Sequence, residues 1–151
     1  MKLKNVRVAL SEPRKFIPLG NGYWCYNYLV KTEQSAPRSD TSAQSDDPGH
    51  ESKAVTIYHY LRIIFFGRPD YKRCVEAVIR EYLTQSQEFD LINSYNRAQL
   101  GQLSDDDAEK ARADYTEYLG LLDEIKTKVH TDFDTRDADL GSRRAASPVN
   151  S

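Results

Sequence analysis

The feature that most constrains the fold is a change in side-chain periodicity at "GRP", residues 67–69. Before it, the run "AVTIYHYLRIIFF" at residues 54–66 is rich in β-branched and aromatic residues, which is typical of a strand. After it, apolar side chains recur at steps of three and four residues, which predicts an amphipathic helix from Pro69 to about Leu83. These side chains are Tyr71, Val75, Val78 and Tyr82. Strands followed by helices indicate an α+β fold.

Two further strands are expected before residue 54. The run "LKNVRVAL" at residues 3–10 alternates, and one of its two sets predicts a half-buried strand. That set consists of Lys4, Val6, Val8 and Leu10. A second strand should run from about Tyr23 to Lys31. Because the second and third strands are consecutive and long, we expect them to pair as an antiparallel hairpin, giving a three-stranded, mostly antiparallel sheet.

Two more helices should follow the first. Thr84 and Gln87 have the spacing of a capping box, which predicts a helix from Ser86 to Leu100 that stops at Gly101. Its inward side chains should be Phe89, Ile92 and Tyr95. Ser104, followed by three aspartates, predicts the start of a third and longest helix that reaches about His130.

The third helix carries a seam of apolar or small residues with heptad spacing. The seam consists of Ala108, Ala111, Tyr115, Tyr118, Leu122, Ile125 and Val129. Two interpretations remain open. The seam could pack on the two shorter helices of the same chain, which we favour because those helices need a cover, or it could join copies of the chain into a homo-oligomer.

Two polar segments interrupt the expected domain. Residues 34–53 and 134–151 lack periodicity and large apolar side chains, the composition of chain that cannot offset its ordering entropy. We therefore expect one α+β domain made of residues 1–33 and 54–133. Residues 34–53 would form a disordered linker within the hairpin, and residues 134–151 a disordered tail.

No motif in the chain predicts catalysis, a cofactor or a metal ion. The sequence contains no P-loop, no GxGxxG, no GxSxG elbow and no pair of histidines at ligand spacing. Cys25 and Cys74 form no CxxC and are expected to be reduced, partly buried thiols. We therefore expect a protein that is not an enzyme.

Charge is distributed unevenly along the chain. Residues 1–33 carry a net charge of +4 and residues 84–140 a net charge of −8, a polarity that could steer a partner or align copies head to tail. The bases are too scattered for a dedicated nucleic-acid binder. The chain also has no apolar run long enough for a membrane helix and no signal-peptide pattern, so we expect it in the cytoplasm.

The aromatic residues of the two central strands are the best candidates for a binding site. If one face of each strand aligned, it would form a ridge of amphipathic rings, of the kind that is common at protein interfaces. The predicted protein-binding residues are Trp24, Tyr26, Tyr28, Tyr58, Tyr60 and Arg62. Two other interpretations stay open: the rings could form the core and cross-strand pairs, or they could stack on a sugar or single-stranded nucleic acid.

Residues 67–101 and 114–129 resemble small proteins encoded by bacteriophages and by prophages of gut anaerobes. The residues that carry the resemblance are Tyr71, Val75, Ile79, Arg80, Tyr82 and Thr84. The resemblance implies an accessory role in virion or tail assembly through binding to another protein, in the host cytoplasm or in the virion. The chain departs from better-known tail-fibre assembly proteins because it lacks their Trp-rich C-terminus. The alternative is a host-interaction factor, an acidic inhibitor of a bacterial system that acts on nucleic acid.

Overall fold

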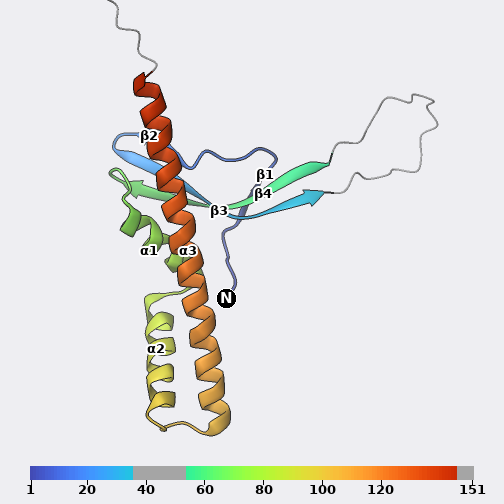
Figure 1. Cartoon of the computed structure of the whole chain (residues 1–151), viewed down its shortest axis with the longest axis vertical. Coiled ribbons are helices and arrows are strands. Elements are labelled where there is room, and N and C mark those ends of the chain that lie inside the picture. The colour runs from blue at the N-terminus through green and yellow to red at the C-terminus, as the bar shows by residue number, and fades with distance from the viewer. Residues whose placement is uncertain (36–53, 146–151) are drawn as a thin grey trace, which may run out of the picture.

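The computed structural model describes residues 1–35 and 54–145, with residues 137–145 described by their backbone alone. Four strands precede three helices (Figure 1). The strands are β1 (Arg7–Ala9), β2 (Phe16–Gly20), β3 (Tyr23–Ser35) and β4 (Val55–Phe66). The helices are α1 (Tyr71–Tyr82), α2 (Gln85–Gln99) and α3 (Asp105–Ala145). The fold is α+β, as predicted, and the long third helix is confirmed.

All neighbouring strands pair antiparallel, in the order β1-β4-β3-β2. The expected hairpin of β3 and β4 is confirmed, but the sheet has four strands where we expected three. The additional strand, β2, contains Pro18, and prolines are rare within strands. Because β2 is an edge strand, a residue without an N–H group can be accommodated in it. The turn from β2 to β3 places Gly20, Asn21 and Gly22 at positive φ, which glycine and asparagine tolerate best.

The first strand differs from its prediction. β1 is only three residues long, and the expected inward residues Val6, Val8 and Leu10 are exposed. The reason is the place where β1 pairs. It lies beside Tyr58–Tyr60 of β4, whereas the β4 side chains that the helices cover begin at Leu61. A strand at this end of the sheet has no helix against which to bury its apolar face.

Helices α1 and α3 cover one face of the sheet and create the main core. Its fully or nearly buried members are Tyr26, Tyr28, Leu61, Phe65, Cys74, Val75, Val78, Ile79, Ile125 and Val129. Asp70 caps α1, accepting a hydrogen bond from the backbone N–H of Arg73, so Pro69 precedes the helix instead of opening it. Cys25 and Cys74 are free and buried, as expected for reduced thiols.

Helix α2 and residues 105–118 of α3 form a helical hairpin that extends away from the sheet, and we call it the arm (Figure 1). The predicted capping box at Thr84 and Gln87 is confirmed. Gly101 follows the helix at a φ of 67°, as its role as a stop requires. The expected inward position of Phe89 is wrong, because Glu88 faces α3 and the next residue points about 100° away from it.

The seam of α3 is covered within the chain. Every one of its predicted members is buried or half-buried, against α2 in the arm or against α1 and the sheet further along. The favoured interpretation of the seam is therefore the one that the structure shows.

Helix α3 also continues past residue 133 into the segment expected to be a disordered tail. Phe133 packs edge-on against Phe16 with 4.9 Å between ring centroids, and Thr135 donates a hydrogen bond to the carbonyl of Thr131. These contacts tie the helix to β2 and support its later turns. Apart from Gln34 and Ser35, which end β3, the predicted linker at 34–53 lies almost entirely outside the described residues, as does the tail beyond residue 145.

Candidate protein-binding surface

The pairing register separates the predicted aromatic residues onto two faces of the sheet. Trp24, Tyr26 and Tyr28 lie opposite Phe65, Ile63 and Leu61, on the face that the helices cover. Directly paired residues of antiparallel strands share a face. Tyr60 pairs with Leu29, and Tyr58 pairs with Thr32 beyond a register shift at Leu29/Lys31, so both tyrosines belong to the other face. The expected single ridge of five rings is therefore wrong.

Tyr26 and Tyr28 are core residues rather than exposed contact residues. The Tyr26 hydroxyl donates a 2.7 Å hydrogen bond to Asp132 of α3, which is also nearly buried. Burial, followed by the nearby Asp132 carboxylate, raises the pKa of Tyr26 far above the ordinary phenol range. The Lys128 ammonium lies 5.6 Å from the centre of the Tyr28 ring, a cation–π distance. Neither ring can meet a partner without local unfolding.

Trp24 occupies an intermediate position at the β2 edge of the same face. It is half-buried, and it forms one wall of a cleft between β2 and the far part of α3. Of the three N-terminal rings that we predicted to bind a partner, only Trp24 is accessible from solvent.

The second face of the sheet, which we call the open face, has a polar centre. Asn27 is buried there and donates a 2.7 Å hydrogen bond to the carbonyl of Arg14, in the segment between β1 and β2. Its side-chain oxygen accepts from Arg62 at 3.2 Å and from the Cys25 thiol at 3.4 Å. The predicted residue Arg62 is thus held in place, and its guanidinium lies 5.8 Å from the Tyr60 ring centre.

The electrostatics of the open face are basic near Cys25. Burial raises the pKa of the Cys25 thiol, while the positive charges of Arg62 and Arg7 act in the opposite direction. Both arginines are therefore close enough to influence the same buried group. Tyr60 is buried among these residues and Tyr58 is half-buried.

The exposed apolar residues of the open face are Tyr23, Ile64 and Phe66, which we call the open-face patch. Their side chains are 47%, 51% and 68% exposed, respectively. Tyr23 pairs directly with Phe66, with 5.3 Å between ring centroids and 69° between the ring planes, and Ile64 lies on the same face two residues before Phe66. Three large side chains thus form one continuous apolar surface.

The β2–β3 turn lies against the Phe66 ring of this patch. Gly22 has a φ of 80°, which favours glycine, and a Cβ atom added to it would come 3.2 Å from a ring carbon of Phe66, a close contact. The backbone N–H of Gly67 also donates a 2.7 Å hydrogen bond to the carbonyl of Gly22. Phe66 is therefore exposed but well positioned. Sequence reasoning missed the patch because Tyr23 lies on the opposite face of β3 from the selected Trp24, Tyr26 and Tyr28. Phe66 shares the face of the selected Tyr60 and Arg62, but it was not selected.

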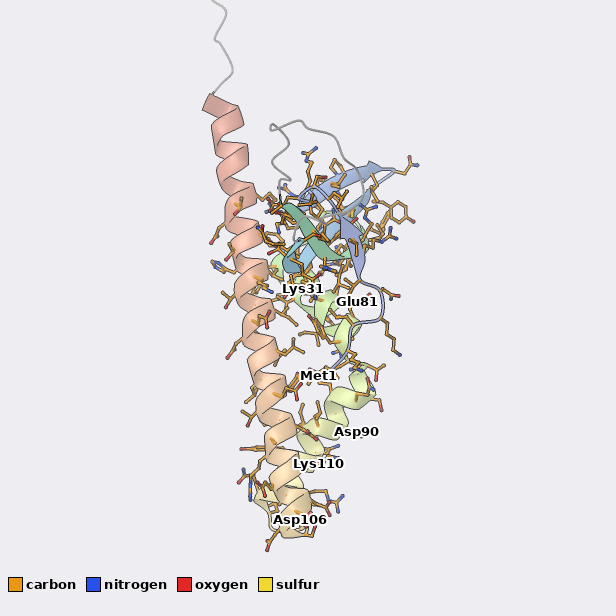
Figure 2. The ribbon with its side chains drawn as sticks, turned by 90° about the vertical axis from the view of Figure 1, so that its right-hand side faces the viewer. Met1, Lys31, Glu81, Asp90, Asp106 and Lys110 are labelled. Carbon is orange, nitrogen blue, oxygen red and sulfur yellow. The ribbon has the colours of Figure 1, made fainter. Side chains whose placement is uncertain are left out.

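The arm carries a polar network instead of a patch. The Tyr118 hydroxyl donates to Glu88, which also accepts a 2.5 Å hydrogen bond from Arg80 of α1. The hydrogen bond from Tyr118, ahead of the contributions of Arg80, lowers the pKa of Glu88 below its usual value. The outer surface of the arm is acidic, and Figure 2 shows Asp90 and Asp106 along its length.

Comparison with protein-family models, with curated proteins and with solved structures finds no match to this chain. Within residues 1–35 and 54–145, no helix has both the length and the apolar character needed to cross a membrane. In the same part of the chain, no three His, Cys, Asp or Glu side chains converge as a metal site would require.

Proposed function

We propose that this chain is a non-catalytic binding protein that engages another protein through the open-face patch. The observation that carries the proposal is the contiguous exposure of Tyr23, Ile64 and Phe66 on a sheet whose other face is covered by helices. Aromatic side chains at an interface supply large contact area with few rotatable bonds. Two of these three side chains are rings that already contact each other, so binding would cost little additional side-chain entropy.

The charges of the neighbouring residues indicate which side chains a partner would present to this face. Arg62 and Arg7 lie beside Cys25 on the same face, and Cys25 pairs with Ile64 of the patch. A protein segment that presents apolar side chains flanked by Asp or Glu would match both the patch and these cations. The resemblance to small bacteriophage proteins favours a virion or tail component as that partner, with this chain as an assembly accessory.

The test combines site-specific crosslinking with reconstitution. A photocrosslinking residue at position 66 is compared with one at position 89, since Phe89 is a similarly exposed ring on the arm. A protein that crosslinks to position 66 and not to position 89 is then purified, and its affinity for the chain is measured. We expect I64S/F66S to weaken binding by at least about tenfold, because it removes two exposed apolar anchors. The matched variant F89S should bind normally.

An unchanged affinity of I64S/F66S, with its circular dichroism spectrum preserved, would refute the role of the patch. Capture of the same proteins at positions 66 and 89 would refute it as well, because the two rings lie on different parts of the molecule.

The acidic arm supports a second candidate function. Residues 85–118 contain eight Asp or Glu and three Arg or Lys, a net charge of −5 on a helical hairpin that projects from the sheet. Such a surface could occupy the phosphate-binding groove of a nucleic-acid-directed protein, as the alternative interpretation of the sequence requires. Charge reversal at Asp106 and Asp107 separates the two proposals, because it should abolish this inhibition and leave binding through the open-face patch unchanged.

A further inference from the structure

A cleft of about 510 Å³ lies on the helix-covered side of the sheet, at the open edge of β2. It is bounded by the segment between β1 and β2, by β2 and Trp24, by the connection from β4 to α1, and by α3. The lining includes Arg14, Lys15, Trp24, Arg68, Asp132 and Arg136. None of these residues belongs to the open-face patch, and the volume lies within the usual range for sites that bind small molecules.

The apolar part of the cleft is held by ring contacts. Phe16 stacks on Tyr26 with 4.9 Å between ring centroids and 16° between their planes. The Arg136 guanidinium lies 5.3 Å from the centre of the Phe16 ring and 4.4 Å from that of Phe133. Trp24 adds a half-buried indole wall. This arrangement gives a pre-formed, flat surface for another planar group.

Asp132, the nearly buried acid of the cleft, already has a hydrogen-bond donor and an ion-pair partner. Asp132 accepts the 2.7 Å hydrogen bond of Tyr26, and the Lys15 ammonium lies 3.5 Å from its other oxygen. Once this pair and Arg136, which has contacts of its own, are set aside, the lining retains Arg14 and Arg68 against Glu12. The uncompensated charge is therefore positive.

Two of these arginines are exposed at the rim of the cleft. Among the described residues, neither the Arg14 nor the Arg68 guanidinium forms an ion pair, and their only hydrogen bonds are accepted by their backbone carbonyls. A guanidinium binds phosphate oxygens in a bidentate manner. Both side chains can therefore turn to a ligand without breaking a contact that stabilises the fold.

We propose that this cleft binds a mononucleotide, with its phosphate on Arg14 and Arg68 and its base against Trp24. The cations account for the phosphate, the Trp24 indole accounts for the planar base, and the volume accommodates one such molecule. This site is independent of the protein-binding role of the open-face patch. It gives a ligand to Trp24, which we had predicted to bind a protein and which is the only solvent-accessible ring of Trp24, Tyr26 and Tyr28.

Trp24 is the only tryptophan in the chain, so its fluorescence reports on this cleft alone. We suggest titrating the full chain with AMP, with adenosine and with inorganic phosphate, and following tryptophan emission together with calorimetry. We expect saturable quenching by AMP and weaker binding of both fragments, because each fragment lacks one of the two recognised groups. Affinity for AMP should fall as salt concentration rises.

The R68A and R14A variants should each weaken AMP binding by about tenfold, the effect of losing one charge-assisted contact. R97A is the matched control, since it removes an exposed arginine from α2 in the arm, and it should bind AMP as the wild type does. W24F, followed by calorimetry, should bind AMP more weakly. The proposal fails if AMP gives no saturable signal, if phosphate binds as tightly as AMP, or if R68A and R97A have the same affinity.

Discussion

The core beneath the sheet and the arm are stabilised in different ways, although α3 runs through both. In the core, large side chains are buried from four elements, including Tyr26 and Ile125. In the arm, the buried cluster consists of Ala98, Ala108 and Ala111, with Leu103 packed beside them, and the one large buried side chain is Tyr118, which is hydrogen-bonded to Glu88. Alanine removes little apolar area from water, so the arm depends more on polar contacts and helix caps. The comparison teaches that one continuous helix can have a strongly anchored half and a weakly anchored half.

The largest effect should come from the core. Ile125 of α3 is fully buried between the sheet and α1, and I125A should lower the free energy of unfolding by about 2–5 kcal/mol in urea denaturation. The matched change L119A removes a partly exposed side chain from the same helix and should cost far less. Equal losses would show that the burial of Ile125 does not anchor this half of α3.

A smaller loss is expected from the buried polar contact of the core. Y26F removes the hydroxyl that donates to Asp132 and leaves that nearly buried carboxylate with Lys15 alone, which should cost about 1–3 kcal/mol. Y95F is the control, because Tyr95 is stacked on Tyr115 in the arm at 4.2 Å between ring centroids. If thermal unfolding showed Y26F to be as stable as Y95F, the Tyr26–Asp132 contact would not stabilise the core.

Within the arm, Glu88 should matter most. E88Q removes the charge that strengthens the hydrogen bonds from Tyr118 and Arg80, and we expect a loss of about 1–2 kcal/mol. Hydrogen exchange should then accelerate in α2 and residues 105–118, and not in β3 or β4. Equal acceleration in the strands would show that arm and core unfold as one unit.

The cap of α2 should contribute about 1 kcal/mol. T84A removes the side-chain acceptor for the N–H of Gln87 and the hydroxyl that donates to the Gln87 side chain, whereas the backbone N–H of residue 84 can still donate to Gln87. S86A changes an exposed residue inside the same helix and should have little effect. The difference is best measured as α2 exchange rates in both variants, and no difference would indicate that tertiary contacts alone hold the start of α2.

The smallest expected effect is the pH dependence that Glu88 gives to the stability of the arm. The folded state lowers the pKa of Glu88 from its ordinary value of 4.5, so its stabilising contribution is complete above about pH 4.5. As pH falls through the lower, folded pKa, this contribution is lost. Acidification should therefore speed the exchange of wild-type α2 relative to that of α2 in E88Q, which should lack this component.

Local signals in the sequence predicted most elements correctly. The β3–β4 hairpin, the cap at Thr84, the stop at Gly101 and the seam of α3 all depend on neighbouring residues, which the sequence displays directly. The end of α3 could not be predicted in this way. It is supported by Phe133 on Phe16 and by Asp132 on Tyr26, contacts between residues more than a hundred positions apart.

The candidate site was harder to predict, because it depended on register. Alternation placed Trp24, Tyr26 and Tyr28 on one face of their strand correctly, but it could not tell which face of β4 they would join. The pairing of Tyr26 with Ile63 and the shift at Leu29/Lys31 decide that question, and both are tertiary properties. A residue such as Phe66 becomes a candidate only when the covered face is known.

The 41 residues of α3 correspond to a rod about 60 Å long at the rise of an α-helix. Because the acidic hairpin sits toward one end and the basic cleft toward the other, this rod sets the distance between opposite charges. A charged assembly would therefore orient the chain through long-range electrostatics before the two molecules come into contact.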